Sequence, residues 1–400
     1  MSALTTPKSR DSTISVTVVV PTHNSAAYLS ACLQCLRKSV GCSYELIVVD
    51  DCSTDKTREI ALRFNARVIT LPKKSGPATA RNRAVPECRS DILVFIDSDV
   101  LVRENTLQQL REKLEDDSLA AVFGSYDQRP KVRTFVSVYK NLMHHFFHQR
   151  AGGNVETFWS GCGAIRTAVF KEVGGFNENF PHPSIEDIEL GMRLSEQGHS
   201  ILLSPDIQAQ HTKRWTLLKL IYTDVFRRGI PWTRLMFCRD GLKDNLNTQW
   251  GQRFSVMIAG VLLLVTGIIS LQRPACALMP AILVAFLLAT DFISSLVGLT
   301  GVVVNASAAI LVVAALLCLV WEPLTLSILF LAVVIWGINL PSLLFLCRAE
   351  GSSFAVMSLP LHLLYFFYCG VAFAGGVLLH WMKIPLLKTQ HREKTLEPTN

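Results

Sequence analysis

The sequence predicts two regions of different fold class: an α/β domain with a doubly wound parallel sheet, and an all-α transmembrane domain after it. The first half of the 400-residue chain alternates short β-branched runs with helical patterns, the order that a doubly wound sheet requires. From Phe254 to Trp381, ionisable residues are sparse and the apolar runs are long enough to cross a bilayer. Residues 1–13 are polar, so we expect a disordered N-terminus without a signal peptide.

The first strands and helices follow from the spacing of apolar residues. Pro21 is expected to break the first strand, and Asn24 or Ser25 to cap the helix after it. Thr54 or Asp55 is expected to cap the second helix. The expected strands are 15–20, 44–49, 68–71 and 92–96, and the expected helices between them are 25–36, 54–64 and 78–84.

Polar residues follow three of these strands directly. They are Pro21-Thr22, Asp50-Asp51 and the run Asp97-Ser98-Asp99. The carboxyl ends of parallel strands meet at one sheet edge, where open α/β sheets bind ligands. Two carboxylates two residues apart can reach one Mg²⁺ or Mn²⁺ ion. A solvated acidic turn is the alternative for D-x-D alone, but the convergence of three strand ends predicts a nucleotide crevice, without the G-x-G-x-x-G pattern of dinucleotide binders.

Seven motifs then occur in order over roughly residues 14–215. They are V-V-V-P-T-H-N at 18–24, V-V-D-D-C-S-T-D-K-T at 48–57, G-P-A-T-A-R-N at 76–82, D-S-D at 97–99, F-W-S-G-C-G-A-I-R at 158–166, V-G-G-F at 173–176 and S-I-E-D-I-E-L-G-M-R-L at 184–194. With these motifs the sequence resembles the family 2 glycosyltransferases, which have the GT-A fold. The resemblance implies a GT-A domain over 14–212. Cys52 departs from the pattern, because the family usually has Gly there.

The resemblance implies a site for a nucleotide-diphosphate sugar. Asp51 is expected to meet the nucleobase, and Arg81 to lie near the base or the diphosphate. The metal ligands implied for Mg²⁺ or Mn²⁺ are Asp97, Asp99 and His211, with a ribose contact as the alternative for Asp97. Trp159 either stacks on a sugar or belongs to the core. The implied nucleotide-sugar contacts are Pro21, Thr22, Asn24, Asp50, Asp51, Arg81, Asp97, Ser98, Trp159 and Gly161.

The resemblance also implies the catalytic base. Asp187, beside Glu186 at the start of a helix, is expected to deprotonate an acceptor hydroxyl, which then attacks the anomeric carbon and inverts its configuration. Ordinary helix-start acidity is the alternative for this pair. His211 opens H-x-x-R-W, where processive synthases carry Gln, which favours a non-processive enzyme. The H-H-x-x-H run at 144–148 is expected on the acceptor side or on a membrane-facing helix surface.

The segment 213–253 carries nine Lys or Arg residues and three Asp residues among apolar residues at helical spacing. This pattern predicts an interfacial amphipathic helix on an anionic leaflet, broken at Gly229–Trp232, and not a nucleic-acid-binding patch. The transmembrane region 254–381 is expected to hold four or five helices, at about 254–272, 275–297, 301–321, 323–347 and 356–380. Basic residues place both 213–253 and the polar tail 382–400 in the cytoplasm, yet five spans would separate them.

Together these features predict a multi-pass protein of the inner or plasma membrane with a cytoplasmic catalytic domain. We expect it to move a sugar from a nucleotide-diphosphate sugar, most plausibly a UDP-sugar, to a lipid or polyprenyl acceptor. The alternatives are a polyprenyl-phosphate sugar synthase, a processive polysaccharide synthase, and a membrane scaffold that senses nucleotide sugars without turning them over.

Overall fold

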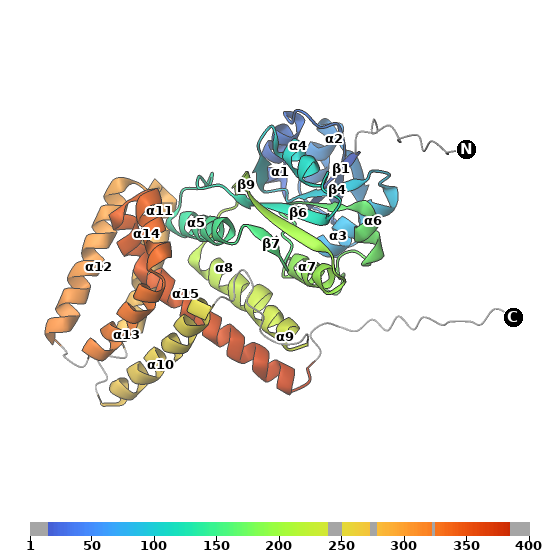
Figure 1. Cartoon of the computed structure of the whole chain (residues 1–400). Helices are drawn as coiled ribbons and strands as arrows, with labels where there is room; N and C mark the ends of the chain where they lie inside the picture. The colour runs from blue at the N-terminus through green and yellow to red at the C-terminus, as the bar shows by residue number, and fades with distance from the viewer. Residues whose placement is uncertain (1–14, 239–249, 273–277, 322–324, 385–400) are drawn as a thin grey trace, which may run out of the picture.

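Nine strands of the N-terminal half form one continuous sheet within the residues that the computed structural model describes, which are 15–238, 250–272, 278–321 and 325–384. Figure 1 shows this α/β domain beside a separate group of long helices. The strands are β1 (Val16–Thr22), β2 (Tyr44–Asp50), β3 (Arg67–Thr70), β4 (Ile92–Ile96), β5 (Val100–Val102), β6 (Leu119–Tyr126), β7 (Gly153–Val155), β8 (Cys162–Arg166) and β9 (Ser200–His211).

The parallel part of the predicted sheet is confirmed, and the rest of the sheet is mixed. Strands β3, β2, β1 and β4 are adjacent and parallel. Beyond β4 the order continues β8, β6, β9 and β5, and β8 runs antiparallel to both of its neighbours. This reversal places Cys162 opposite Ile96, so that the start of β8 meets the end of β4. The antiparallel strand thereby brings the 158–166 motif to the polar edge of the sheet.

Two boundaries near the first motif differ from the expected ones. Strand β1 continues through Pro21 to Thr22, because β1 pairs with β4 only as far as Val19 and the missing N–H of Pro21 costs no hydrogen bond on that side. The second helix begins at Thr57, since Asp55 lies before it and its carboxylate accepts hydrogen bonds from the Thr57 and Ala26 amides, at 3.0 and 3.1 Å. One side chain therefore serves two helix starts.

Helices cover both faces of the sheet. Alternate strand residues point to opposite faces, so Val94 packs with α1 and α4 while Phe95 packs with α3, α6 and α7. The predicted buried strand at 92–96 is confirmed, since all five of its side chains are buried. The helices of the domain are α1 (Ala26–Arg37), α2 (Thr57–Arg63), α3 (Pro77–Ala84), the 3-10 helix η1 (Val85–Glu87), α4 (Thr106–Lys113), α5 (Phe135–Arg150), α6 (Thr167–Glu172) and α7 (Glu186–Glu196).

The basic segment forms one uninterrupted helical run: α8 (Leu217–Tyr222), the π-helix η2 (Thr223–Gly229) and α9 (Ile230–Cys238). The expected break at Gly229–Trp232 is wrong. Pro231 has no N–H to donate to the carbonyl four residues earlier, that of Arg227. The hydroxyl of Ser184 donates to this Arg227 carbonyl instead, so the helix continues with that acceptor satisfied. The part of the predicted segment at 239–249 lies outside the described residues.

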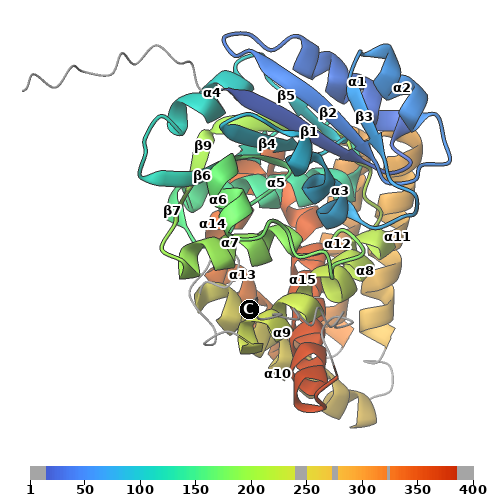
Figure 2. The same cartoon turned by 90° about the vertical axis from the view of Figure 1, so that its right-hand side faces the viewer.

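Six helices follow among the described residues, and Figure 2 shows α10, α13 and the end of α15 below the sheet. Among the described residues, two are long and apolar enough to cross a membrane, Trp250–Leu271 and Ser352–Trp381, and a bent pair makes a third if counted as one. Ala281–Val297 and Gly301–Val312 are shorter apolar helices. The helices are α10 (Trp250–Gln272), α11 (Leu278–Val297), α12 (Gly301–Trp321), α13 (Thr325–Ile338), α14 (Leu340–Glu350) and α15 (Ser352–Trp381).

The bent pair corrects the expected span at 323–347. The chain turns by 76° between Ile338 and Leu340, so α13 and α14 are separate helices. Pro341 lies in the first turn of α14 and has no N–H for a bond back into α13. Asn339 at the bend donates to the Ser255 hydroxyl of α10 at 2.7 Å, which holds the end of α13 beside the start of α10.

The helical region and the α/β domain share a hydrophobic core. Phe135 and Leu142 of α5 are fully buried in a cluster that includes Trp215, Leu287 of α11 and Phe354 of α15. Arg133, just before α5, makes two 2.7 Å hydrogen bonds to the two carboxylate oxygens of Glu350. The described parts of the two regions are therefore packed directly on each other.

Candidate active site

The polar ends of β1, β2 and β4 lie side by side, as expected for parallel strands. Thr22 is in register with Asp50, and the Asp51 amide donates to the Thr22 carbonyl at 2.8 Å. Past the end of β4, the Ser98 hydroxyl donates to the Ser25 hydroxyl at 3.0 Å. The sheet edge therefore brings the first, second and fourth motifs together.

Asp51 is buried and already has partners. Its two carboxylate oxygens accept hydrogen bonds from the amides of Ser75 and Gly76, at 2.6 and 2.8 Å. The carboxylate of Asp50 accepts from the Ser53 amide at 3.1 Å. The second motif therefore positions the loop that precedes α3, and the contact of Asp51 with a nucleobase stays a prediction.

The loops after β1 and β2 hold each other in an unusual backbone conformation. Asn24 and Cys52 have positive φ angles, 48° and 58°. The Asn24 side-chain oxygen accepts from the Thr54 backbone amide at 2.8 Å. The backbone amide of Asn24 donates to the Ser53 hydroxyl at 2.9 Å. The left-handed conformation at Cys52 is the one that glycine adopts without strain, which explains the glycine usual at this place in the motif.

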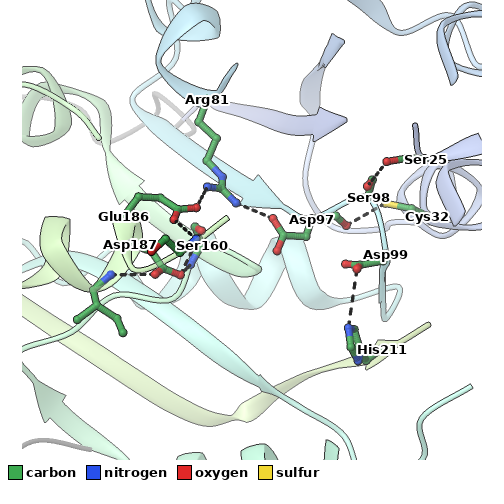
Figure 3. Close-up of polar contacts among 12 residues, drawn as sticks. Ser25, Cys32, Arg81, Asp97, Ser98, Asp99, Ser160, Glu186, Asp187 and His211 are labelled. Carbon is green, nitrogen blue, oxygen red and sulfur yellow. Dashed lines mark hydrogen bonds and ion pairs between the residues drawn. The ribbon is translucent and has the colours of Figure 1, made fainter. Parts of the chain in front are cut away.

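Arg81 is the central cation of the site (Figure 3). Its side chain is 3% exposed, and its guanidinium donates to Asp97 at 2.7 Å and to Glu186 at 3.1 Å. The guanidinium carbon also lies 5.2 Å from the centre of the Phe176 ring. Arg81 thereby joins the end of β4 to the start of α7, two segments distant in sequence. Sequence reasoning placed Arg81 near the nucleotide but missed this bridge, because the spacing of the motifs carries no signal for it.

Asp187 lies beside Glu186 at the start of α7 (Figure 3). One of its oxygens accepts weakly from the Ser160 amide and hydroxyl, at 3.3 and 3.4 Å, and the other accepts from the Ile188 amide at 2.9 Å. Burial, followed by the negative charge of Glu186, raises the pKa of Asp187 to about 6. At neutral pH this carboxyl is ionised and is a stronger base than an ordinary aspartate.

Asp99 and His211 face each other from the end of β4 and the end of β9, with 3.8 Å between the Asp99 Oδ2 and His211 Nε2 atoms (Figure 3). Burial raises the pKa of both Asp97 and Asp99, while Arg81 opposes the shift at Asp97 and Lys213 opposes it at Asp99. Burial also lowers the pKa of His211 to about 3, so its imidazole is neutral, the form that binds metals.

These residues fit a hard divalent cation. A separation of 3.8 Å lets both atoms reach one ion at a ligand distance of about 2.1 Å. Two carboxyls whose pKa is raised by burial are stabilised in their ionised form by such an ion. Within the described ranges, no group of three His, Cys, Asp or Glu side chains forms a complete metal site. Asp97 is directed toward Arg81, which separates it from the Asp99–His211 pair.

Trp159 belongs to a wall of stacked rings beside Asp99. Its ring packs edge-on against Tyr126, with centroids 4.8 Å apart, and lies 5.0 Å from His144. A side chain at Gly161 would come within 2.4 Å of the Trp159 ring, so Gly161 makes room for the tryptophan. Tyr126 in turn stacks on His211 at 4.4 Å. No motif indicated Tyr126, while the H-H-x-x-H run indicated the histidines without their place in this wall.

The sheet and this site define the class of the domain. It is a GT-A-like α/β domain of the nucleotide-diphosphate-sugar transferase type, with carboxylates at the ends of parallel strands and an antiparallel strand carrying the 158–166 motif. The family model described as "Glycosyl transferase family 2" matches residues 17–174. The chain therefore carries a family 2 glycosyltransferase domain.

Among curated proteins, the chain is similar to the pre-mycofactocin glycosyltransferase of Mycobacterium tuberculosis, with 29% identity over 232 residues, 56% of this chain and 48% of that protein. It is also similar to the O-antigen chain rhamnosyltransferase WbaN of Salmonella anatum, with 27% identity over 240 residues, 56% of this chain and 75% of that protein. The match thus spans about half the length of the first of these relatives.

Two solved structures are similar in fold. One is Staphylococcus aureus TarS in complex with UDP-GlcNAc, with a TM-score of 0.39, 23% identity, and coverage of 51% of this chain and 60% of that one. The other is the mannosyltransferase PcManGT from Pyrobaculum calidifontis in complex with GDP-Man and Mn²⁺, with a TM-score of 0.47, 18% identity, and coverage of 83% and 88%. Both TM-scores are below 0.5, and neither structure bears on the function proposed below.

Proposed function

We propose that this protein is a membrane-bound glycosyltransferase that moves a sugar from a nucleotide-diphosphate sugar to an acceptor at the membrane surface. The observation that supports it most is the placement of Asp187. This carboxyl has a pKa raised to about 6 and lies at the same sheet edge as Asp97 and Asp99. Arg81 connects its helix to Asp97 through Glu186. A raised-pKa base beside carboxylates suited to a divalent cation fits transfer chemistry better than binding alone.

In this proposal Asp187 removes the proton from the acceptor hydroxyl as the hydroxyl attacks the anomeric carbon, and one displacement inverts that carbon. Arg81 keeps α7 and the end of β4 in one arrangement, and Trp159 offers an aromatic face for a sugar ring. Asp99 and His211, with Asp97 nearby, would hold Mg²⁺ or Mn²⁺. When bound, such an ion would neutralise charge on the leaving diphosphate.

The donor in this proposal is a UDP-sugar, because a buried carboxylate such as Asp51 suits the ring N–H of uracil. The acceptor is a lipid or polyprenyl compound, and the catalytic domain is cytoplasmic in a multi-pass protein of the inner or plasma membrane. The core shared by α5, α11 and α15 supports the proposed membrane location, since it attaches the domain directly to the apolar helices. A polyprenyl-phosphate sugar synthase differs only in acceptor, and a processive synthase would give a long polymer.

Nucleotide release by the detergent-purified protein tests the function. A panel of nucleotide sugars is offered with Mn²⁺ or Mg²⁺, with and without a total lipid extract. We expect one donor to be turned over, faster with lipid, and the activity to be lost in both Asp99→Ala and Asp187→Asn. Asp206→Ala removes an exposed carboxylate from β9 as a matched control and should leave the rate unchanged. No release from any donor would instead support the nucleotide-sugar-sensing scaffold.

The pH dependence of transfer tests the base separately. The ionised form of Asp187 accepts the proton, so the single-turnover rate should rise about tenfold per pH unit up to about pH 6 and level off above it. An ordinary aspartate, with a pKa near 4, would already be ionised at pH 5. The dependence of the rate on the acceptor shows whether the measured step is the chemical one. If the rate of that step is flat from pH 5 to 8, Asp187 is not the base.

A further inference from the structure

Helix α15, the last helix of the described residues, contacts the α/β domain from its first turn. The side of the molecule on which this domain lies is called the catalytic side. The ring of Phe354 lies 5.7 Å from that of Phe135 in α5. Two turns later, the His362 Nδ1 and Tyr139 hydroxyl oxygen are 2.8 Å apart, a hydrogen bond whose donor depends on the tautomer. Both partners belong to α5, so the N-terminal half of α15 contacts a helix of the α/β domain at two places.

The C-terminal half of α15 continues along η2 and α9. The Tyr368 hydroxyl donates to Asp224 at 3.0 Å, and this carboxylate also accepts from Lys140 of α5 at 2.9 Å. Glycines allow close approach further on, since a side chain at Gly229 or at Gly376 would come within 2.6 Å of the facing helix. The successive facing pairs are Tyr368 with Asp224, Ala372 with Gly229, Gly376 with Thr233, and His380 with Phe237.

The helical run α8–η2–α9 is itself held against the α/β domain. The Ser184 hydroxyl donates to the Arg227 carbonyl, and Trp232 and Leu235 of α9 pack with Ile185 beside the start of α7. This run also carries too many charges to lie across a hydrocarbon core: Lys219, Asp224, Arg227, Arg228 and Arg234. Because α15 lies beside it from Tyr368 to His380, the C-terminal half of α15 runs alongside this charged helical run, as Figure 1 shows.

The other helices behave differently. The start of α10 meets the end of α13 through Ser255 and Asn339. Asp291 near the end of α11 accepts from the Leu217 amide at 3.0 Å, and Leu299 before α12 donates to the Arg133 carbonyl at 2.9 Å. One end of each of these four helices is therefore on the catalytic side, alternating in chain order, and Figure 1 shows α10, α12 and α13 extending away from the domain.

From these contacts we propose that α15 lies in the membrane interface, parallel to the underside of the catalytic domain, and that only α10 to α13 cross the bilayer. Four crossings return the chain to the side on which it started. The end of α15 then lies on the same side as the catalytic domain, and the conflict between five apolar segments and two basic cytoplasmic ends disappears.

The partner of the outer face of α15 is the lipid hydrocarbon just below the headgroups. A helix of 30 residues is about 45 Å long, more than a bilayer core requires, and its exposed side chains away from α9 are apolar. The aromatic Trp381 and the basic Lys383 close the helix, as is common at the interface. The exposed apolar residues of this helix are Val371, Phe373, Ala374, Leu378 and Trp381, and of these Phe373 also contacts Phe237 of α9.

Reporter fusions to the full chain test the topology without any need for activity. A fluorescent protein that matures only in the cytoplasm and an alkaline phosphatase active only outside it are fused in turn to the N-terminus and after Asn400. We expect the cytoplasmic reporter to be active at both ends and the phosphatase at neither. Opposite sides for the two ends would overturn the proposal, whatever the outcome of the transferase assays.

A depth measurement distinguishes the proposal from any other topology with an even number of crossings. Spin labels are placed one at a time at Val371 and Leu378 of α15 and at Met257 and Leu264 of α10, four exposed positions, in proteoliposomes of a variant whose accessible cysteines are replaced by serine. The two α10 labels should differ in depth by about 10 Å, the rise of seven residues, and the two α15 labels by much less. A depth change along α15 equal to that along α10 would show that α15 crosses the bilayer.

Discussion

Replacing Asp187 with Asn is expected to lower the rate of sugar transfer by about 10²- to 10⁴-fold, the usual contribution of a positioned general base. Asparagine has nearly the same shape and can keep the contacts with the Ser160 hydroxyl and the Ile188 amide, but it cannot accept the proton. Binding of the nucleotide sugar, measured by calorimetry on the purified protein, should change little. The loss should therefore appear in the turnover rate.

Glu196→Gln is the matched control for this substitution. It removes a carboxylate from the exposed end of the same helix, α7, and should leave the turnover rate within about twofold. If Asp187→Asn kept more than about a tenth of the wild-type rate, the general base would have to be another group. Weakened nucleotide binding in Asp187→Asn would instead assign the residue to the donor site.

The second large effect is expected at Arg81. Arg81→Met keeps much of the volume but leaves the buried Glu186 and the partly buried Asp97 without their shared cation. Breaking a buried ion pair on one side costs about 3–5 kcal/mol, so the thermal unfolding midpoint of the protein in detergent should fall clearly. The start of α7 should also become less ordered, and transfer should be lost with it.

Two further variants make the interpretation of Arg81→Met specific. Arg83→Met changes an exposed arginine on the same helix, α3, and should leave the unfolding midpoint unchanged. Adding Asp97→Asn to Arg81→Met removes one of the uncompensated charges and should restore part of the lost stability. An Arg81→Met protein as stable as the wild type would show that the bridge contributes nothing to the fold.

Much of the sheet and of the site could be predicted because the signals are local. The run 92–96 is apolar throughout and becomes the fully buried β4, and the acidic residues after it lie at the edge where parallel strands end. The reversal of β8 could not be predicted, because the short apolar run at 162–166 is compatible with either direction. Its pairing with β4 depends on where the intervening α5 leads the chain.

The sequence alone was enough to name the candidate site, which is the acidic pairs at the strand ends and the Glu186-Asp187 helix start, and to name the apolar helices after residue 250. The partners of these residues came from the fold. Arg81 meets Glu186 across 105 residues, and Tyr368 of α15 meets Asp224 across 144. The spacing of apolar residues shows which face of one helix or strand is buried. A contact between distant segments depends instead on the path of the whole chain. For the same reason, α15 has the composition of a membrane span while its contacts place it along the catalytic domain.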